Sequence, residues 1–140
     1  MSKCFFCDIQ KQEDNNYIAD NQYFFARYDD FPLSNGHFEI IPKEHIVSFF
    51  DLTPDQTLLL CSLIKDVKLI IDNKFKPDAY NIGINDGLAA GRTQHHLHVH
   101  LIPRYFGDVE NPKGGIRNII PQKADYIPEM SRIESKKDYL

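Results

Sequence analysis

The sequence predicts an α+β fold in which five antiparallel strands form one sheet and a single long helix crosses one face. Short segments rich in β-branched and aromatic residues predict strands on both sides of one longer segment. That longer segment, residues 54–75, repeats apolar residues at the i, i+3, i+4 spacing of an amphipathic helix. The predicted order is therefore three strands, the long helix and two further strands, preceded by a short helical turn at the N-terminus.

The strands are recognised by their composition and by the turns between them. A polar pair, Asp20-Asn21, separates the first two strands, and Pro42 ends the third because proline has no N–H for a central ladder. The fourth strand delivers Asn85 to a turn that precedes the fifth. The expected strand segments are 17–19, 23–28, 37–41, 80–84 and 96–103.

The long helix has a clear start signal. Thr53 is the expected N-cap, Pro54 occupies the first helical position and Gln56 follows three residues after the cap. Lys76-Pro77 marks the end. Cys61 lies inside this helix and is expected to belong to the core. The apolar stripe contains Leu60, Leu63, Ile64, Val67, Ile70 and Ile71.

Composition restricts the class of protein. The chain has 140 residues, of which 42% are hydrophobic and 26% charged, as expected for one globular domain. No stretch approaches the roughly 20 apolar residues of a membrane span. A net charge of −4 argues against non-specific nucleic-acid binding. Three cysteines without an export signal argue against a disulfide framework, so we expect a cytoplasmic protein.

The most unusual feature is the run from His96 to Pro103. In a strand, successive side chains point to opposite faces, so His96, His98 and His100 would share one face and the apolar residues between them the other. The three imidazoles would then stand about 6–7 Å apart. Two chemistries fit this pattern. One is a metal site, and the other is covalent catalysis in which the middle imidazole attacks an electrophile.

The flanking residues favour covalent catalysis at phosphorus. The glycine-bearing turn from Asn85 to Thr93 is of the kind that brings backbone N–H groups close to phosphate oxygens. Downstream, Arg104 carries a planar donor fork suited to phosphate. Together they indicate phosphoryl or nucleotidyl transfer.

The pattern His-x-His-x-His followed by two apolar residues and Pro103-Arg104 resembles the signature of the histidine triad (HIT) superfamily of nucleotide hydrolases and transferases. Further matches are Cys4-Phe5-Phe6-Cys7, Gly36-His37 and the segment 41–45, Ile-Pro-Lys-Glu-His. Segment 107–117 resembles bacterial members described as diadenosine polyphosphate hydrolases. The resemblance implies a HIT domain over residues 1–121, followed by a C-terminal tail over 122–140. The composition after Pro103 shifts to Gly, Pro, Asn and charged residues, and we expect residues 105–140 to wrap the site or a partner subunit. It also implies a homodimer in which two sheets join.

The resemblance also implies a structural zinc site. Taken alone, Cys4-x-x-Cys7 fits a zinc half-site, a redox pair or two buried apolar residues. In HIT members with this motif, the cysteines pair with a histidine after the Pro-Lys segment and with the first triad histidine. These correspond to His45 and His96, which complete a set of four ligands with no open position for catalysis.

In the catalytic scheme that the resemblance implies, His98 attacks the α-phosphorus of a nucleotide, and water later releases the nucleotidyl-histidine. His100 donates to the phosphate or the leaving group, and His96 orients its neighbours or binds zinc. His37 supports the triad, and His95 is expected to be a surface residue. No organic cofactor is needed.

The implied nucleotide contacts lie before and within the triad. Asp29 is expected to bind the ribose hydroxyls, although it also fits a turn-forming residue. The α-phosphate side would be lined by Asn85, Gly91, Arg92 and Thr93. Arg92 departs from the family, which usually has glutamine there, and either favours a more highly charged polyphosphate or swings out and leaves the contact to Thr93.

Several functions share this chemistry. We favour the prediction of dinucleoside polyphosphate hydrolysis. Hydrolysis of adenosine phosphoramidates and nucleotidyl transfer are alternatives. A non-catalytic nucleotide-binding protein is a further alternative, as is a hydrolase whose catalytic zinc is held by all three triad histidines.

Overall fold

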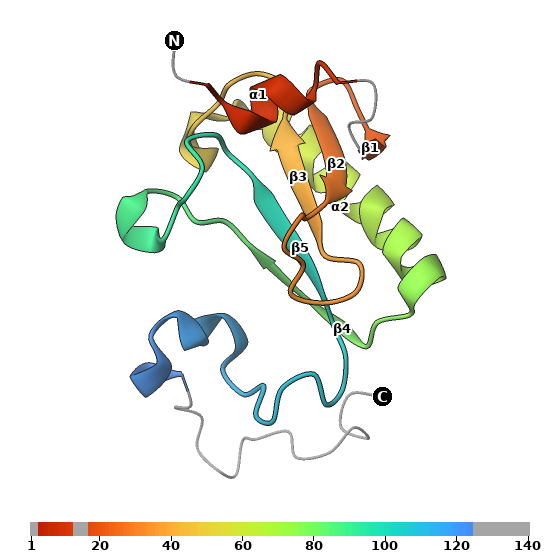
Figure 1. The fold of residues 1–140 in the computed structure, drawn as a ribbon, viewed down its shortest axis with the longest axis vertical. Coiled ribbons are helices and arrows are strands. Elements are labelled where there is room, and N and C mark those ends of the chain that lie inside the picture. The colour runs from red at the N-terminus through yellow and green to blue at the C-terminus, as the bar shows by residue number, and fades with distance from the viewer. Residues whose placement is uncertain (1–2, 13–16, 125–140) are drawn as a thin grey trace. The chain divides into compact units, whose positions relative to one another are not determined.

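The computed structural model of the protein describes residues 3–12 and 17–124, and its elements follow the predicted order (Figure 1). The helices are α1, Phe5–Ile9, and α2, Pro54–Phe75. The strands are β1, Tyr17–Asp20; β2, Phe24–Tyr28; β3, Phe38–Pro42; β4, Ala79–Gly83; and β5, Val99–Arg104. Short 3₁₀ helices cover Phe49–Asp51, Leu88–Ala90, Gly115–Ile119 and Pro121–Lys123. The α+β prediction is confirmed.

The five strands form one antiparallel sheet in the order β1-β2-β3-β5-β4. The chain leaves β3, crosses through α2 to the edge strand β4, and returns to place β5 between β3 and β4. The strand that follows the histidine run is therefore interior, with a hydrogen-bonded neighbour on each side. A side chain on an interior strand has two flanking strands to fix its position.

Helix α2 covers one face of the sheet and buries Leu60, Leu63, Val67 and Ile71 against it. Its start is the predicted capping box, in which the Gln56 backbone N–H donates to the Thr53 hydroxyl and the Thr53 N–H donates to the Gln56 side chain. The helix ends at Lys76, which has a left-handed backbone with φ of 51°. One expectation was wrong. Cys61 is exposed, because it lies outside the stripe that contacts the sheet.

The opposite face carries α1 at one end. Phe6 and Ile9 of this helix pack on Phe25 of β2 and Ile41 of β3, forming a second, smaller apolar cluster. Residues of β2 and β3 alternate between the two clusters, as the period of a strand requires. The rest of this face is polar, and it holds the candidate site.

The fifth strand begins at Val99, three residues later than predicted. The ladder between β3 and β5 runs from Phe38 opposite Leu101 to Ile40 opposite Val99, and β5 begins at Val99. Pro42 ends β3, and the Leu97 backbone N–H instead donates to the carbonyl of Ile46, at 2.7 Å, in the segment after β3. His96 and His98 therefore precede the strand, and the three imidazoles do not form one regular row.

The chain divides into two compact units, with the boundary after Phe106. In the second unit, Gly114 has φ of 84°, and a Cβ there would clash with the carbonyl oxygen of Ala124. The Arg117 guanidinium donates to the carbonyl of Lys123 at 2.8 Å. The domain limit at residue 121 stays a prediction, and residues 125–140 of the predicted tail lie outside the described residues. No helix within the described ranges is long and apolar enough to cross a membrane.

Candidate active site

The candidate site is a grid of polar side chains on the α1 face of the sheet, with Arg27, Glu39 and His100 in one row and Asp29 and His37 in the next. In the strand register, Arg27 lies opposite Glu39, and Glu39 lies opposite His100. One step further along, the Asp29 backbone N–H donates to the carbonyl of His37 at 3.0 Å. Three neighbouring strands thus contribute one charged or titratable side chain each to the same row.

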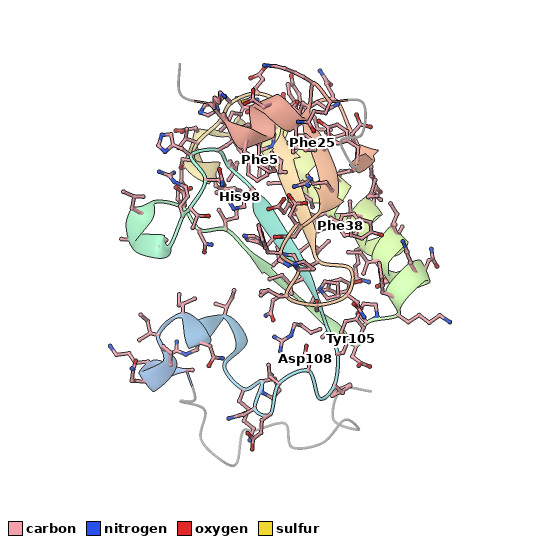
Figure 2. The ribbon with its side chains drawn as sticks, in the orientation of Figure 1. Phe5, Phe25, Phe38, His98, Tyr105 and Asp108 are labelled. Carbon is pink, nitrogen blue, oxygen red and sulfur yellow. The ribbon has the colours of Figure 1, made fainter. Side chains whose placement is uncertain are left out.

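His98 lies at the start of β5, beneath α1 (Figure 2), and is only 7% exposed. Its Nδ1 is 3.0 Å from the carbonyl oxygen of His96. A carbonyl can only accept, so Nδ1 carries the proton and Nε2 keeps its lone pair. The ring packs on Phe6 at 5.3 Å and on His100 at 5.0 Å between centroids. The hydrogen bond to His96 thus fixes the orientation of the ring, and Nε2 is the nitrogen that can act as a nucleophile in the neutral form.

A chain of hydrogen bonds also fixes the tautomer of His100. The backbone N–H of Leu33 donates to His37 Nδ1 at 3.1 Å, so the His37 proton must be on Nε2. That Nε2 lies 3.0 Å from His100 Nδ1 and donates to it. His100 Nδ1 is then an acceptor, and the His100 proton is on Nε2. The backbone N–H of Leu33 thus acts through two successive hydrogen bonds, and it leaves His100 with an N–H donor at Nε2.

Burial keeps both of these rings neutral. It lowers the pKa of His37, although the neighbouring Asp29 carboxylate acts in the opposite direction. Burial, and then the nearby His98 ring, lower the pKa of His100 to about 4. Asp29 Oδ2 is 3.4 Å from His37 Nε2 and 3.6 Å from His100 Nδ1. Asp29 thus lies beside His100, and its Oδ1 also accepts from the Phe31 backbone N–H at 2.7 Å.

Four potential metal ligands meet at the other side of His98. Cys4 and Cys7 of the N-terminal segment converge with His45 and His96, and their ligand atoms all lie within 4.8 Å of one another. The distance from Cys4 Sγ to His96 Nδ1 is 3.2 Å, and Cys7 Sγ lies 3.4 Å from His45 Nδ1 and 3.6 Å from His96 Nδ1. Zinc bonds of about 2.0–2.3 Å at tetrahedral angles require ligand separations of roughly 3.5 Å.

The proton positions in this cluster also suit a metal. His96 Nε2 donates to the carbonyl of Pro42 at 2.9 Å, so Nδ1 faces the two cysteines with a lone pair. Burial, together with Cys4, raises the pKa of the Cys7 thiol to about 11. The thiol is therefore protonated near neutral pH, and a bound metal would displace that proton. The four residues fit a closed zinc site.

The turn between β4 and the triad differs from the expectation. The backbone N–H groups of Gly91 and Arg92 donate to the carbonyls of Leu88 and Gly87, so they close the turn and do not point toward a phosphate. Gly91 supplies the positive φ, 89°, that this closure requires.

The side chains around this turn are also placed. Asn85 and Thr93 are exposed, as is His95, as expected. The Arg92 guanidinium donates to the carbonyl of Val47 at 3.3 Å and lies 3.5 Å from His95 Nδ1. Arg92 is thus held against the segment after β3.

Arg104 of β5 is hydrogen-bonded within the sheet. Its guanidinium donates to Asn81 Oδ1 at 2.6 Å. Ala79 lies opposite Arg104 in the ladder between β4 and β5, so Asn81 is two residues along β4 on the same face. Arg104 thus links β5 to β4, and its contact with a phosphate stays a prediction.

Sequence reasoning missed the charged pair in the middle of the grid. Arg27 is 4% exposed and Glu39 8%, and Arg27 Nη1 donates to Glu39 Oε2 at 3.2 Å. Burial, and then Asp29, raise the pKa of Glu39 to about 7, against the lowering effect of Arg27. A signal was present, because Glu39 is two residues after His37 in a strand and must share its face.

Comparison with known proteins identifies the family. The family model described as "HIT domain" matches residues 10–107. The chain belongs to the HIT family. An uncharacterised HIT-like protein from Methanocaldococcus jannaschii is 36% identical over 120 residues, which are 83% of this chain and 91% of the relative. The bis(5'-nucleosyl)-tetraphosphatase of Schizosaccharomyces pombe is 40% identical over 77 residues, 55% of this chain and 42% of the relative.

A solved structure supports the same assignment. A zinc-bound histidine triad protein from Mycobacterium smegmatis is 31% identical, with a TM-score of 0.68, and the match covers 75% of this chain and 77% of the other. The predicted membership of the HIT family is thus confirmed. The grid of polar side chains on this HIT protein's sheet lies within the matched domain.

Proposed function

We propose that this HIT protein hydrolyses dinucleoside polyphosphates, or related nucleotides, at the α-phosphorus through a nucleotidyl-histidine intermediate. The observation that carries the proposal is the hydrogen bond from His98 Nδ1–H to the carbonyl of His96, because it leaves Nε2 as a nucleophile. The match to a bis(5'-nucleosyl)-tetraphosphatase supports the substrate class.

The first step forms a bond from His98 Nε2 to the α-phosphorus and breaks the bond from that phosphorus to the leaving oxygen. The Nε2–H of His100 donates a hydrogen bond to the leaving oxygen, which departs as a phosphate anion. Both nitrogens of His98 are then substituted, so the ring is cationic, and the carbonyl of His96 stabilises that charge. In the second step, water attacks phosphorus and loses its proton to solvent, the bond to His98 Nε2 breaks, and the electron pair returns to that nitrogen.

We assign the nucleotide contacts by the same geometry. Asp29, beside His100, would bind the ribose hydroxyls, and His100 would contact the phosphate. Asn85, Gly91 and Thr93 would lie on the α-phosphate side through a rearranged turn, with Arg92 contributing charge. His96 has a positioning role, through its carbonyl.

We propose that the Cys4, Cys7, His45 and His96 cluster holds structural zinc. The ion would supply a cross-link between the N-terminal segment and the residues before β5, with no open position for substrate. The zinc-bound structural relative supports this assignment. A homodimer and a cytoplasmic location also stay proposals, supported respectively by the family resemblance and by cysteine use.

The test is mass spectrometry of protein quenched during incubation with diadenosine tetraphosphate and with an adenosine phosphoramidate. We expect an adduct of one nucleoside monophosphate on His98, with turnover of the tetraphosphate. Turnover of the phosphoramidate alone would favour the phosphoramidate hydrolase, and transfer of the nucleotide to phosphate would favour a nucleotidyltransferase. Binding without an adduct or turnover would indicate a non-catalytic nucleotide-binding protein.

A further inference from the structure

The buried charged pair Arg27–Glu39 has no part in the chemistry described above. Both side chains lie on the α1 face, in the same row as His100. Their side chains are 5% and 10% exposed. Burying two charges costs more than burying apolar residues of the same size, and their attraction only partly offsets that cost. A buried pair next to a reacting group therefore calls for a functional explanation.

The hydrogen bonds of the pair are incomplete. Arg27 Nη1 donates to Glu39 Oε2 at 3.2 Å, and Arg27 Nη2 donates to Asp30 Oδ1 at 2.6 Å. Arg27 Nε is buried and has no hydrogen-bond partner, and it is the only such side-chain atom in the part of the chain that the structure describes. A buried donor without a partner is costly, and a ligand acceptor would remove that cost.

The direction of a bound nucleotide places its base over this pair. In the proposed function, the α-phosphorus lies at His98, just before β5, and the ribose at Asp29, just after β2. A base that extends from this ribose along β2 toward α1 lies over Arg27, with Glu39 opposite Arg27 in the register. Arg27 precedes Asp29 by two residues and shares its face. Phe5 of α1 lies on the same side, with its ring centroid 5.7 Å from Arg27 Cζ.

We propose that Glu39 and Arg27 determine base specificity and select guanine over adenine. The inference rests on the proposed nucleotide chemistry, and it replaces the adenosine that the family resemblance suggests. The edge of guanine presents an acceptor, O6, followed by two donors, N1–H and the 2-amino group. Arg27 offers a donor and Glu39 a carboxylate acceptor in the same order along the row. Adenine would place its amino group against the guanidinium and its N1 acceptor against the carboxylate, so that donor faces donor and acceptor faces acceptor.

The experiment measures base preference with the full chain at pH 8, where a carboxyl of pKa about 7 is mostly ionised. Calorimetry gives the dissociation constants of GMP, IMP and AMP, and kcat/KM is compared for diguanosine and diadenosine tetraphosphate. We expect a preference for guanosine on the order of tenfold or more in both measurements. IMP, which lacks the 2-amino group, should bind more weakly than GMP, and this comparison needs no variant.

The variant Glu39→Gln keeps the size of the side chain and replaces one acceptor with a donor. We expect it to weaken GMP binding about tenfold and to leave AMP binding within about twofold. The matched control is Glu110→Gln, an exposed carboxylate in the second unit. Equal affinity for GMP and AMP, a preference for AMP, no measurable GMP binding, or equal losses for both in Glu39→Gln would each overturn the proposal. A retained GMP preference without turnover would count only against the proposed hydrolysis.

Discussion

Two clusters flank His98 and differ in kind, although each brings three or more potential metal ligands together. On the α1 side are Cys4, Cys7, His45 and His96. On the other side are Asp29, His37 and His100. Ligand distances alone do not separate them, but proton positions do. In the first cluster, His96 Nδ1 has a lone pair facing two thiols. In the second, both nitrogens of His37 are already engaged, by Leu33 and by His100.

In both clusters, a hydrogen bond to a backbone group outside the cluster fixes which histidine nitrogens carry protons, and this determines whether the cluster can bind a metal. The carbonyl of Pro42 leaves His96 Nδ1 free to bind a metal, and the amide of Leu33 sets a directed chain of hydrogen bonds through His37 to His100. His98 lies between the two, and its carbonyl partner belongs to His96. We therefore expect changes in one cluster to affect metal binding and stability, and changes in the other to affect turnover.

Loss of the residue between the clusters should have the largest effect. His98→Ala removes the attacking nitrogen and should lower kcat by roughly 10³-fold or more, with nucleotide affinity largely retained. Steady-state kinetics and calorimetry measure the two quantities. The matched control is His95→Ala, an exposed neighbour, which should keep near-normal activity. Substantial turnover by His98→Ala would contradict the nucleophile assignment.

The hydrogen-bond chain from Leu33 through His37 to His100 should show the next largest effect. His37→Ala removes the group that holds the proton of His100 on Nε2 and should lower kcat on the order of 10²-fold. Nitrogen chemical shifts should show His100 as a mixture of tautomers, whereas the wild type should show one. Metal content should not change. If the variant showed a single His100 tautomer and a normal kcat, the hydrogen bond from His37 to His100 would have no role in turnover.

In the metal cluster, the expected loss is in stability. Cys4→Ser and Cys7→Ser should remove bound zinc, measured by elemental analysis, and lower Tm by roughly 10 °C or more. Cys61→Ser provides a matched control, because that cysteine is exposed and outside the cluster. If chelation removed all activity while Tm stayed constant, the zinc would be catalytic, as in the alternative with three histidine ligands.

The smallest expected effect is on the pH dependence of stability. The pKa of His100 is lowered to about 4 by burial and then by His98 and His37, with Asp29 opposing and Glu39 opposite in the sheet. Between pH 6.5 and about 4, the unfolded chain binds more protons at His100 than the native protein does, so this residue's contribution is lost as pH falls.

Between pH 6.5 and about 4, the His100→Asn variant should therefore lose less unfolding free energy than the wild type. We expect the difference to be on the order of 1 kcal/mol, as measured by urea denaturation. The exposed His95→Asn is the control. If His100→Asn and the wild type lost stability in parallel from pH 6.5 to 4, the neutral, buried state of His100 would be contradicted.

Local sequence signals predicted the elements of the fold, and the family resemblance predicted the residues that form the metal cluster. The capping box at Thr53 and Gln56 is a contact between near neighbours, so it can be read from the sequence. The four metal ligands came from the resemblance, since spacing alone cannot bring Cys4 to His96. The start of β5 and the partner of Arg104 depend on strand register, which is a long-range property. The Arg27–Glu39 pair was missed for the same reason.

One further consequence concerns the unfolded chain. The contact between Cys4 and His96 spans 92 positions in the sequence. A single ion bound there would tie the two ends of most of the domain and would reduce the conformational freedom of the denatured ensemble much as a covalent bridge does. The two cysteines also cannot complete this cluster until His96 has been synthesised, whereas Phe6 and Ile9 find their apolar partners on β2 and β3 earlier.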